Sequence, residues 1–70
     1  MTSKGIKKIA KEIRRHRKAK EWTVETLAAK AGVNARHLYR IEAAEVQSPG
    51  WAMLEKIARA LGVEISELMG

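Results

Sequence analysis

Residues 22–42 read WTVETLAAKAGVNARHLYRIE, in which two short apolar patterns stand on either side of a glycine. The helical spacing of these patterns predicts one helix over Val24–Ala31 and a second over Ala35–Ala43. Gly32 suits a tight turn over residues 32–34, because glycine adopts backbone conformations that other residues avoid. Asn34 is a favourable N-cap for the second helix. The stretch therefore predicts two helices joined by a sharp turn, one bracing the other.

The rest of the chain also carries helical patterns. An apolar stripe predicts a long first helix over Lys4–Lys20, and a second stripe runs from Trp51 to Leu61, where Gly62 ends it. A short helix over Ile65–Met69 follows. No segment has the alternation of a strand, and no linker or repeat divides the sequence. We therefore expect an all-α, compact five-helix bundle that forms one domain over residues 1–70.

The composition excludes several classes of protein. The chain has 70 residues and no cysteine, which rules out disulfide bonds and cysteine-ligated zinc and fits a cytoplasmic location. No apolar run approaches the roughly 20 residues that a membrane-spanning helix needs. The basic N-terminus is not followed by an apolar segment of the kind found in secretory signals.

The net charge of +6 is unevenly distributed. Nine basic residues and one acid lie between Lys4 and Lys20, a local charge of +8, whereas the remainder of the chain carries −2. Such a block suits a polyanionic partner, either a phosphate backbone or an anionic membrane surface. It equally suits a solvated helix face. Since the apolar side of this helix is needed for the core, we expect no membrane binding.

The helix over residues 35–43 presents a distinctive outer face. Leu38 and Ile41 fix its buried side, because successive helical residues are rotated by about 100°. The outer face then consists of Ala35, Arg36, Tyr39, Arg40 and Ala43. Arginine can donate two hydrogen bonds to guanine in the major groove, and tyrosine can contact a phosphate or a thymine methyl group. Two exposed arginines are also common on ordinary surface helices.

Three segments carry a resemblance to a known family. They are TVETLAAKAGVN at residues 23–34, HLYRIE at 37–42, and SPGWAMLEKIARALGVEISEL at 48–68. Together they resemble the lambda-repressor-like helix-turn-helix domain of the Cro/repressor, or Xre, family, over a range from Ile9 to Leu68. The resemblance implies that the second helix of the motif enters the major groove of DNA.

The resemblance also assigns roles to individual residues. Base contacts fall on Ala35, Arg36, Tyr39 and Arg40. Predicted phosphate contacts are Thr23, Val24, Asn34, His37, Ala44 and Gln47, with Lys7, Lys11, Arg14 and Lys30 adding positive charge near the backbone. A structural ion pair is expected between Arg17 and Glu42. Two departures weaken the usual phosphate clamp, because Val24 replaces a common glutamine and Glu45 brings negative charge into the loop after the recognition helix.

These observations favour one function and leave an alternative. We expect a sequence-specific DNA-binding transcriptional regulator without a cofactor or metal, with double-stranded DNA as partner and a homodimer formed on it. No pattern of serine, histidine and acid, and no metal-ligand spacing, indicates an enzyme. The alternative is a protein-interaction module of the same scaffold, similar to antitoxins or bridging factors, that binds a protein partner. RNA binding is less favoured, because a single tyrosine on the exposed face offers a poor stacking surface.

Overall fold

The computed structural model describes residues 3–46 and 48–69. Over these residues the chain forms only helices: α1 (Ser3–Ala19), α2 (Val24–Ala31), α3 (Ala35–Glu42), α4 (Trp51–Leu61) and α5 (Ile65–Met69). The prediction of an all-α fold with five helices is confirmed. The bounds of α2 match the prediction, α1 lies one residue earlier than expected at both ends, and α3 ends one residue before the predicted Ala43.

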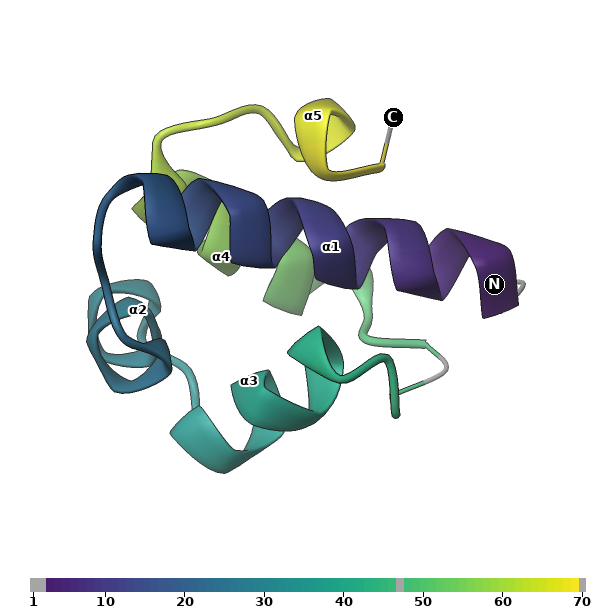
Figure 1. Cartoon of the computed structure of the whole chain (residues 1–70), viewed down its shortest axis with the longest axis horizontal. Coiled ribbons are helices and arrows are strands. Elements are labelled where there is room, and N and C mark those ends of the chain that lie inside the picture. Colours follow the sequence, from purple (N-terminus) through teal and green to yellow (C-terminus); the bar gives the residue numbers. More distant parts are fainter. Residues whose placement is uncertain (1–2, 47, 70) are drawn as a thin grey trace.

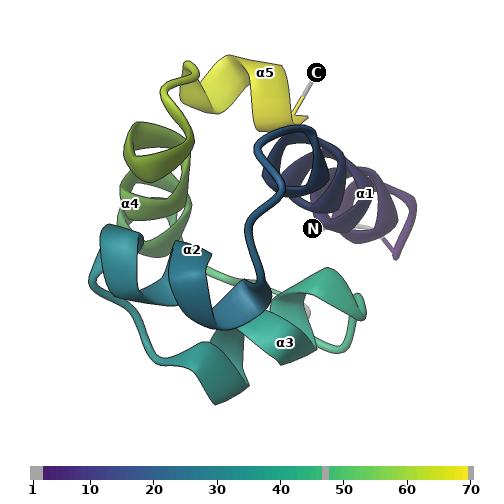
Figure 2. The same cartoon turned by 60° about the vertical axis from the view of Figure 1, so that its left-hand side comes forward.

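The helices surround a core to which each of them contributes. In Figure 1, α1 crosses the molecule with α3 below it and α5 above it, and both helices pack against α1. Figure 2 shows α2 in front of α4, against which it packs. The largest fully buried side chains are Ile13, Leu27, Leu38, Leu54, Ile57 and Leu68. Because α3 gives only one side to this core, its other side remains free.

The first four helices end in the same way. After each helix one residue takes the left-handed backbone conformation, at Glu21 (φ 58°), Gly32 (φ 71°), Ala44 (φ 59°) and Gly62 (φ 74°). Its N–H bonds to the carbonyl three residues back, and the next N–H bonds to the carbonyl five residues back, at 2.9–3.3 Å. This Schellman arrangement satisfies the last carbonyls of a helix and turns the chain sharply. It also explains why α3 stops before Ala43, since the chain already turns away there.

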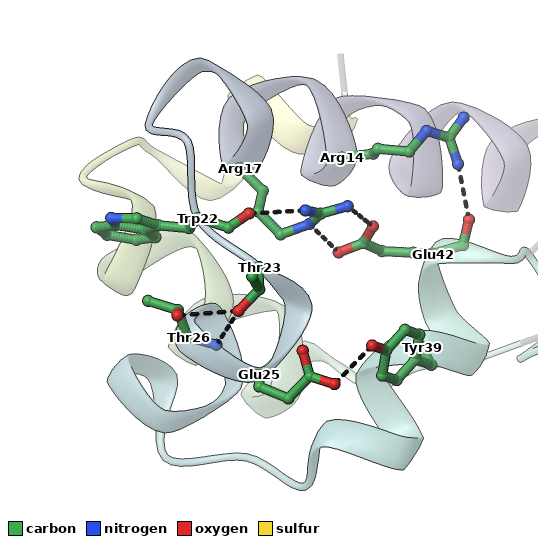
Figure 3. A network of polar contacts seen from close by, with 8 residues as sticks. All are labelled: Arg14, Arg17, Trp22, Thr23, Glu25, Thr26, Tyr39 and Glu42. Carbon is green, nitrogen blue, oxygen red and sulfur yellow. Dashed lines mark hydrogen bonds and ion pairs between the residues drawn. The ribbon is translucent and has the colours of Figure 1, made fainter.

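A buried ion pair joins α1 to α3. Arg17 Nε and Nη2 each donate to one carboxylate oxygen of Glu42 at 2.9 Å, and Arg17 Nη1 donates to the carbonyl oxygen of Trp22 at 2.8 Å (Figure 3). The Arg17 and Glu42 side chains are only 11% and 7% exposed. The hydrogen bonds to Glu42 raise the pKa of Arg17. The structure thus brings together the two residues that the resemblance pairs, and it fixes α3 against α1.

A second arginine of α1 reaches the same point of α3. Arg14 Nη1 donates to the backbone carbonyl oxygen of Glu42 at 3.1 Å. This carbonyl lies at the C-terminal end of α3, where the helix dipole favours a cation. The side chain and the backbone of Glu42 are therefore both held by arginines of α1.

We expect the change Ala44→Gly to stabilise the fold by about 0.5–1 kcal/mol. Glycine removes the cost of a Cβ atom in the left-handed conformation, which exceeds the entropy that glycine adds to the unfolded chain. For a domain of this size the gain corresponds to a Tm increase of roughly 2–8 °C, measured by circular dichroism. Ala43→Gly is the matched control, because Ala43 has a φ of −87° and glycine there brings only its entropic cost. A Tm below the wild-type value for Ala44→Gly would contradict the assigned turn.

The ion pair leads to a second stability prediction. Arg17→Met should lower the free energy of unfolding by about 3–5 kcal/mol, because it leaves the Glu42 carboxylate buried without a partner. The double change Arg17→Met/Glu42→Leu should recover most of this loss, since no unpaired charge then remains. Urea unfolding followed by circular dichroism measures both, with Glu42→Leu as the other single variant. If the two single losses simply add in the double variant, the pair is not coupled as described.

Candidate nucleic-acid interface

Two side chains hold the first turns of α2 and α3. The N–H of Thr26 donates to Thr23 Oγ1 at 3.0 Å, and the N–H of His37 donates to Asn34 Oδ1 at 3.1 Å. Both are N-caps, as the sequence predicted for Asn34, and each satisfies a backbone donor that the helix itself leaves free. Together with the left-handed Gly32, these caps set the two helices of the motif at a sharp angle.

The outer side of α3 is rich in polar side chains. Leu38 and Ile41 are buried in the core, whereas the exposed residues of the helix are Arg36, Tyr39 and Arg40. The structure therefore brings these three together on one face, followed by the exposed Ala43. Ala35 differs from the expectation of an exposed position. It is half-buried, because it packs against the hydrophobic core cluster.

The two arginines of this face differ in their surroundings. Within residues 3–46 and 48–69, the side chain of Arg36 has neither a hydrogen-bond nor an ion-pair partner. Arg40 Nε lies 3.8 Å from Glu45 Oε1, and both side chains are more than half exposed. Exposed pairs of this kind stabilise a fold by at most about 1 kcal/mol. The negative charge of Glu45 therefore lies beside Arg40. Breaking this ion pair to free Arg40 for a ligand costs little free energy.

Tyr39 contacts the other helix of the motif. Its hydroxyl donates to Glu25 Oε2 at 2.6 Å, across the angle between α3 and the first turn of α2 (Figure 3). This hydrogen bond raises the pKa of Tyr39 and lowers the pKa of Glu25, because it favours the protonated phenol and the ionised carboxylate. Sequence reasoning missed this contact. The two residues are 14 positions apart, and only the angle between the helices brings them together.

The predicted phosphate contacts of α2 lie in different surroundings. Thr23 is exposed, and its hydroxyl donates to Thr26 Oγ1 at 2.9 Å. The Val24 side chain is buried, so only its backbone could face a phosphate. Lys30 lies at the opposite end of α2, where its Nζ is 5.0 Å from the ring centre of Trp22. The structure therefore does not bring Lys30 together with Thr23.

The other predicted phosphate contacts lie in α1, in α3 and in the segments before and after α3. Asn34 is exposed, while His37 and the left-handed Ala44 are half-buried. Gln47 lies outside the described residues. On α1, the exposed cations Lys7, Lys11 and Arg14 follow one another at helical spacing on one side of the helix. Of these, Arg14 is partly engaged by the carbonyl of Glu42.

Among residues 3–46 and 48–69, no group of three or more histidine, cysteine or acidic side chains could hold a metal ion. In the same part of the chain, no helix has the length and apolar character needed to cross a membrane.

The chain resembles known proteins along most of its length. A family described as the helix-turn-helix domain matches residues 8–68. The HTH-type transcriptional regulator SlrR of Bacillus subtilis is 35% identical over 60 residues, which are 86% of this chain and 40% of SlrR. The chain thus spans about two fifths of the length of that relative.

Solved structures share the arrangement of helices. The N-terminal DNA-binding domain of SinR from Bacillus subtilis superimposes with a TM-score of 0.85 at 34% identity, over 89% of this chain and 90% of that domain. The restriction-modification controller protein C.AhdI from Aeromonas hydrophila gives a TM-score of 0.84 at 28% identity, over 90% and 94% of the two chains. With the two capped helices and the turn at Gly32, these matches show that the chain belongs to the helix-turn-helix domain family, in its lambda-repressor-like form.

Proposed function

We propose that this domain binds double-stranded DNA sequence-specifically and regulates transcription, with α3 in the major groove. The observation that carries the proposal is the outer face of α3, where the exposed Arg36 lies with Arg40 and Tyr39. An arginine held on a rigid helix can donate two hydrogen bonds to O6 and N7 of guanine. The ion pair between Arg17 and Glu42 supplies that rigidity.

The relatives and the charge of the chain support the same function. The N-terminal DNA-binding domain of SinR has this fold, and SlrR is a transcriptional regulator. The net charge of +6 favours approach to a phosphate backbone. In this proposal Thr23, Asn34 and the exposed cations of α1 contact phosphates and fix the register of α3 on the duplex.

We also infer how the domain is used. One copy makes few base contacts, so we propose that two copies bind as a two-fold homodimer on inverted half-sites about one helical turn apart. The domain needs no cofactor in this proposal, catalyses no reaction, and acts in the cytoplasm, where its DNA lies. The exposed Trp51 at the start of α4, 59% accessible, is a candidate contact between the two copies.

Selection from randomised duplex DNA at about 150 mM salt tests the proposal. We expect the wild-type chain to enrich one motif made of two inverted half-sites. Arg36→Ala/Arg40→Ala should bind that duplex at least about 30-fold more weakly, because two base contacts are lost, each contributing about 1–3 kcal/mol. Its binding to unrelated duplexes should fall much less, since phosphate contacts remain.

The matched control is Lys56→Ala/Arg59→Ala, which removes two exposed cations of α4 and therefore the same charge. We expect this variant to retain the motif and most of the affinity. If the wild-type chain enriches no motif and its binding is weak and lost as salt rises, base recognition by α3 is wrong. A protein partner would then be the target to seek.

A further inference from the structure

The hydrogen bond between α2 and α3 determines what Tyr39 can offer to a ligand. Tyr39 lies on the outer face of α3, and its side chain is 50% exposed. Its hydroxyl reaches towards α2 and donates to Glu25 Oε2 at 2.6 Å, a short distance of the kind found when a carboxylate accepts from a hydroxyl (Figure 3). Glu25 is itself exposed in the first turn of α2.

The chemistry of the two groups leaves only acceptors on this part of the face. A phenol has one hydrogen, and here that hydrogen is directed to Glu25. The remaining lone pairs of the Tyr39 oxygen can only accept, and an ionised carboxylate can only accept as well. A phosphate oxygen would therefore meet acceptors and a negative charge at this point. The contact with a phosphate that the sequence suggested for Tyr39 is thus disfavoured.

Bases differ in the groups they present to such an acceptor. In the major groove, cytosine offers its N4 amine and adenine its N6 amine, whereas guanine and thymine offer the acceptors O6 and O4. We propose that the Glu25–Tyr39 pair is a specificity element that selects a base with an exocyclic amine, cytosine or adenine, opposite the Tyr39 oxygen. Tyr39 makes the contact and Glu25 is the positioning residue. This inference rests on the proposed function.

The surroundings of the pair keep it intact near neutral pH. The hydrogen bond from Tyr39 lowers the pKa of Glu25, so that the carboxylate stays ionised as the pH falls below the usual range. The same bond raises the pKa of Tyr39, so that the phenol keeps its hydrogen as the pH rises. Arg17 adds a nearby positive charge that further favours the ionised form of Glu25. At pH values above the pKa of Glu25 and below the pKa of Tyr39, the two groups therefore keep the protonation states that this hydrogen bond requires.

The same selection from randomised duplex DNA tests this inference with two single variants. Every base pair carries one exocyclic amine in the major groove, on either cytosine or adenine, so the test removes that amine at the motif position whose preference depends on Tyr39. Purine in place of adenine, or pyrimidin-2-one in place of cytosine, should weaken binding of the wild type by about fivefold and leave the binding of Tyr39→Phe unchanged. Tyr39→Phe removes the oxygen and should reduce that preference by about fivefold, leaving the other positions unchanged. Glu25→Gln should also weaken the preference and tolerate the reversed base pair at this position, because a glutamine amide carries both a donor and an acceptor and no longer fixes the direction of the Tyr39 hydrogen. Glu55→Gln, which removes an exposed carboxylate from α4, should leave the motif unchanged.

A titration without DNA tests the pair itself. The chain contains a single tyrosine, so the ultraviolet absorbance of phenolate reports on Tyr39 alone. We expect the wild-type pKa of Tyr39 to lie above the ordinary value of 10, and Glu25→Gln to lower it towards that value. Thermal unfolding checks that each variant is folded. If Glu25→Gln does not fold, Tyr39→Phe still tests the base preference.

The outcomes separate this inference from the function on which it rests. If the wild-type chain enriches no motif, both fail. A motif that is identical in the wild type, Tyr39→Phe and Glu25→Gln would overturn the specificity element and leave the function standing. Wild-type binding that is unchanged when the amine is removed at the Tyr39-dependent position would overturn it too, since Tyr39 would then not accept from that amine. A Tyr39 pKa that Glu25→Gln leaves unchanged would show that the pair does not form in solution.

Discussion

The bidentate ion pair between Arg17 and Glu42 is the constraint on which the rest of the structure depends. A helix of eight residues such as α3 is too short to be stable alone. Its fully buried apolar side chains are Leu38 and Ile41. These apolar contacts set which side of the helix faces the core. The ion pair adds a directional restraint, because a guanidinium and a carboxylate joined by two hydrogen bonds restrict the relative orientation of the elements that carry them. The outer face of α3 is therefore held in one direction.

The sharp ends of the helices complete this arrangement. Each of the first four helices is closed by a left-handed residue, and α2 and α3 are also capped at their first turns by Thr23 and Asn34. Short connections between short helices keep α2 close enough to α3 for Glu25 to reach Tyr39. The same geometry that supports the fold thus shapes the chemistry of the candidate interface. The arginines of this interface can donate hydrogen bonds to a ligand, whereas the Glu25–Tyr39 pair can only accept them.

Local signals in the sequence were sufficient for the helices but not for every turn or contact. The caps Thr23 and Asn34 and the glycines after α2 and α4 are recognisable because residue type and backbone conformation agree there. Glu21 and Ala44 adopt the left-handed conformation without being glycine, so no residue type marks them. The pairing of Arg17 with Glu42 came from the family resemblance. The contact between Glu25 and Tyr39 depends on the angle between two helices, which no local pattern encodes, and the packing of Ala35 depends on it as well.

The most direct test of the central claim is a two-dimensional NMR titration of the 15N-labelled domain with duplex DNA. We predict that the largest amide shift changes fall on residues 35–40 of α3 and on the first turn of α2, where the proposed interface lies. The amides of α5, and those of α4 beyond its first turn, where Trp51 lies, should change little. Changes centred on α4 and α5, or none at all at a duplex concentration that saturates binding, would contradict the assignment of the outer face of α3 as the DNA-reading surface.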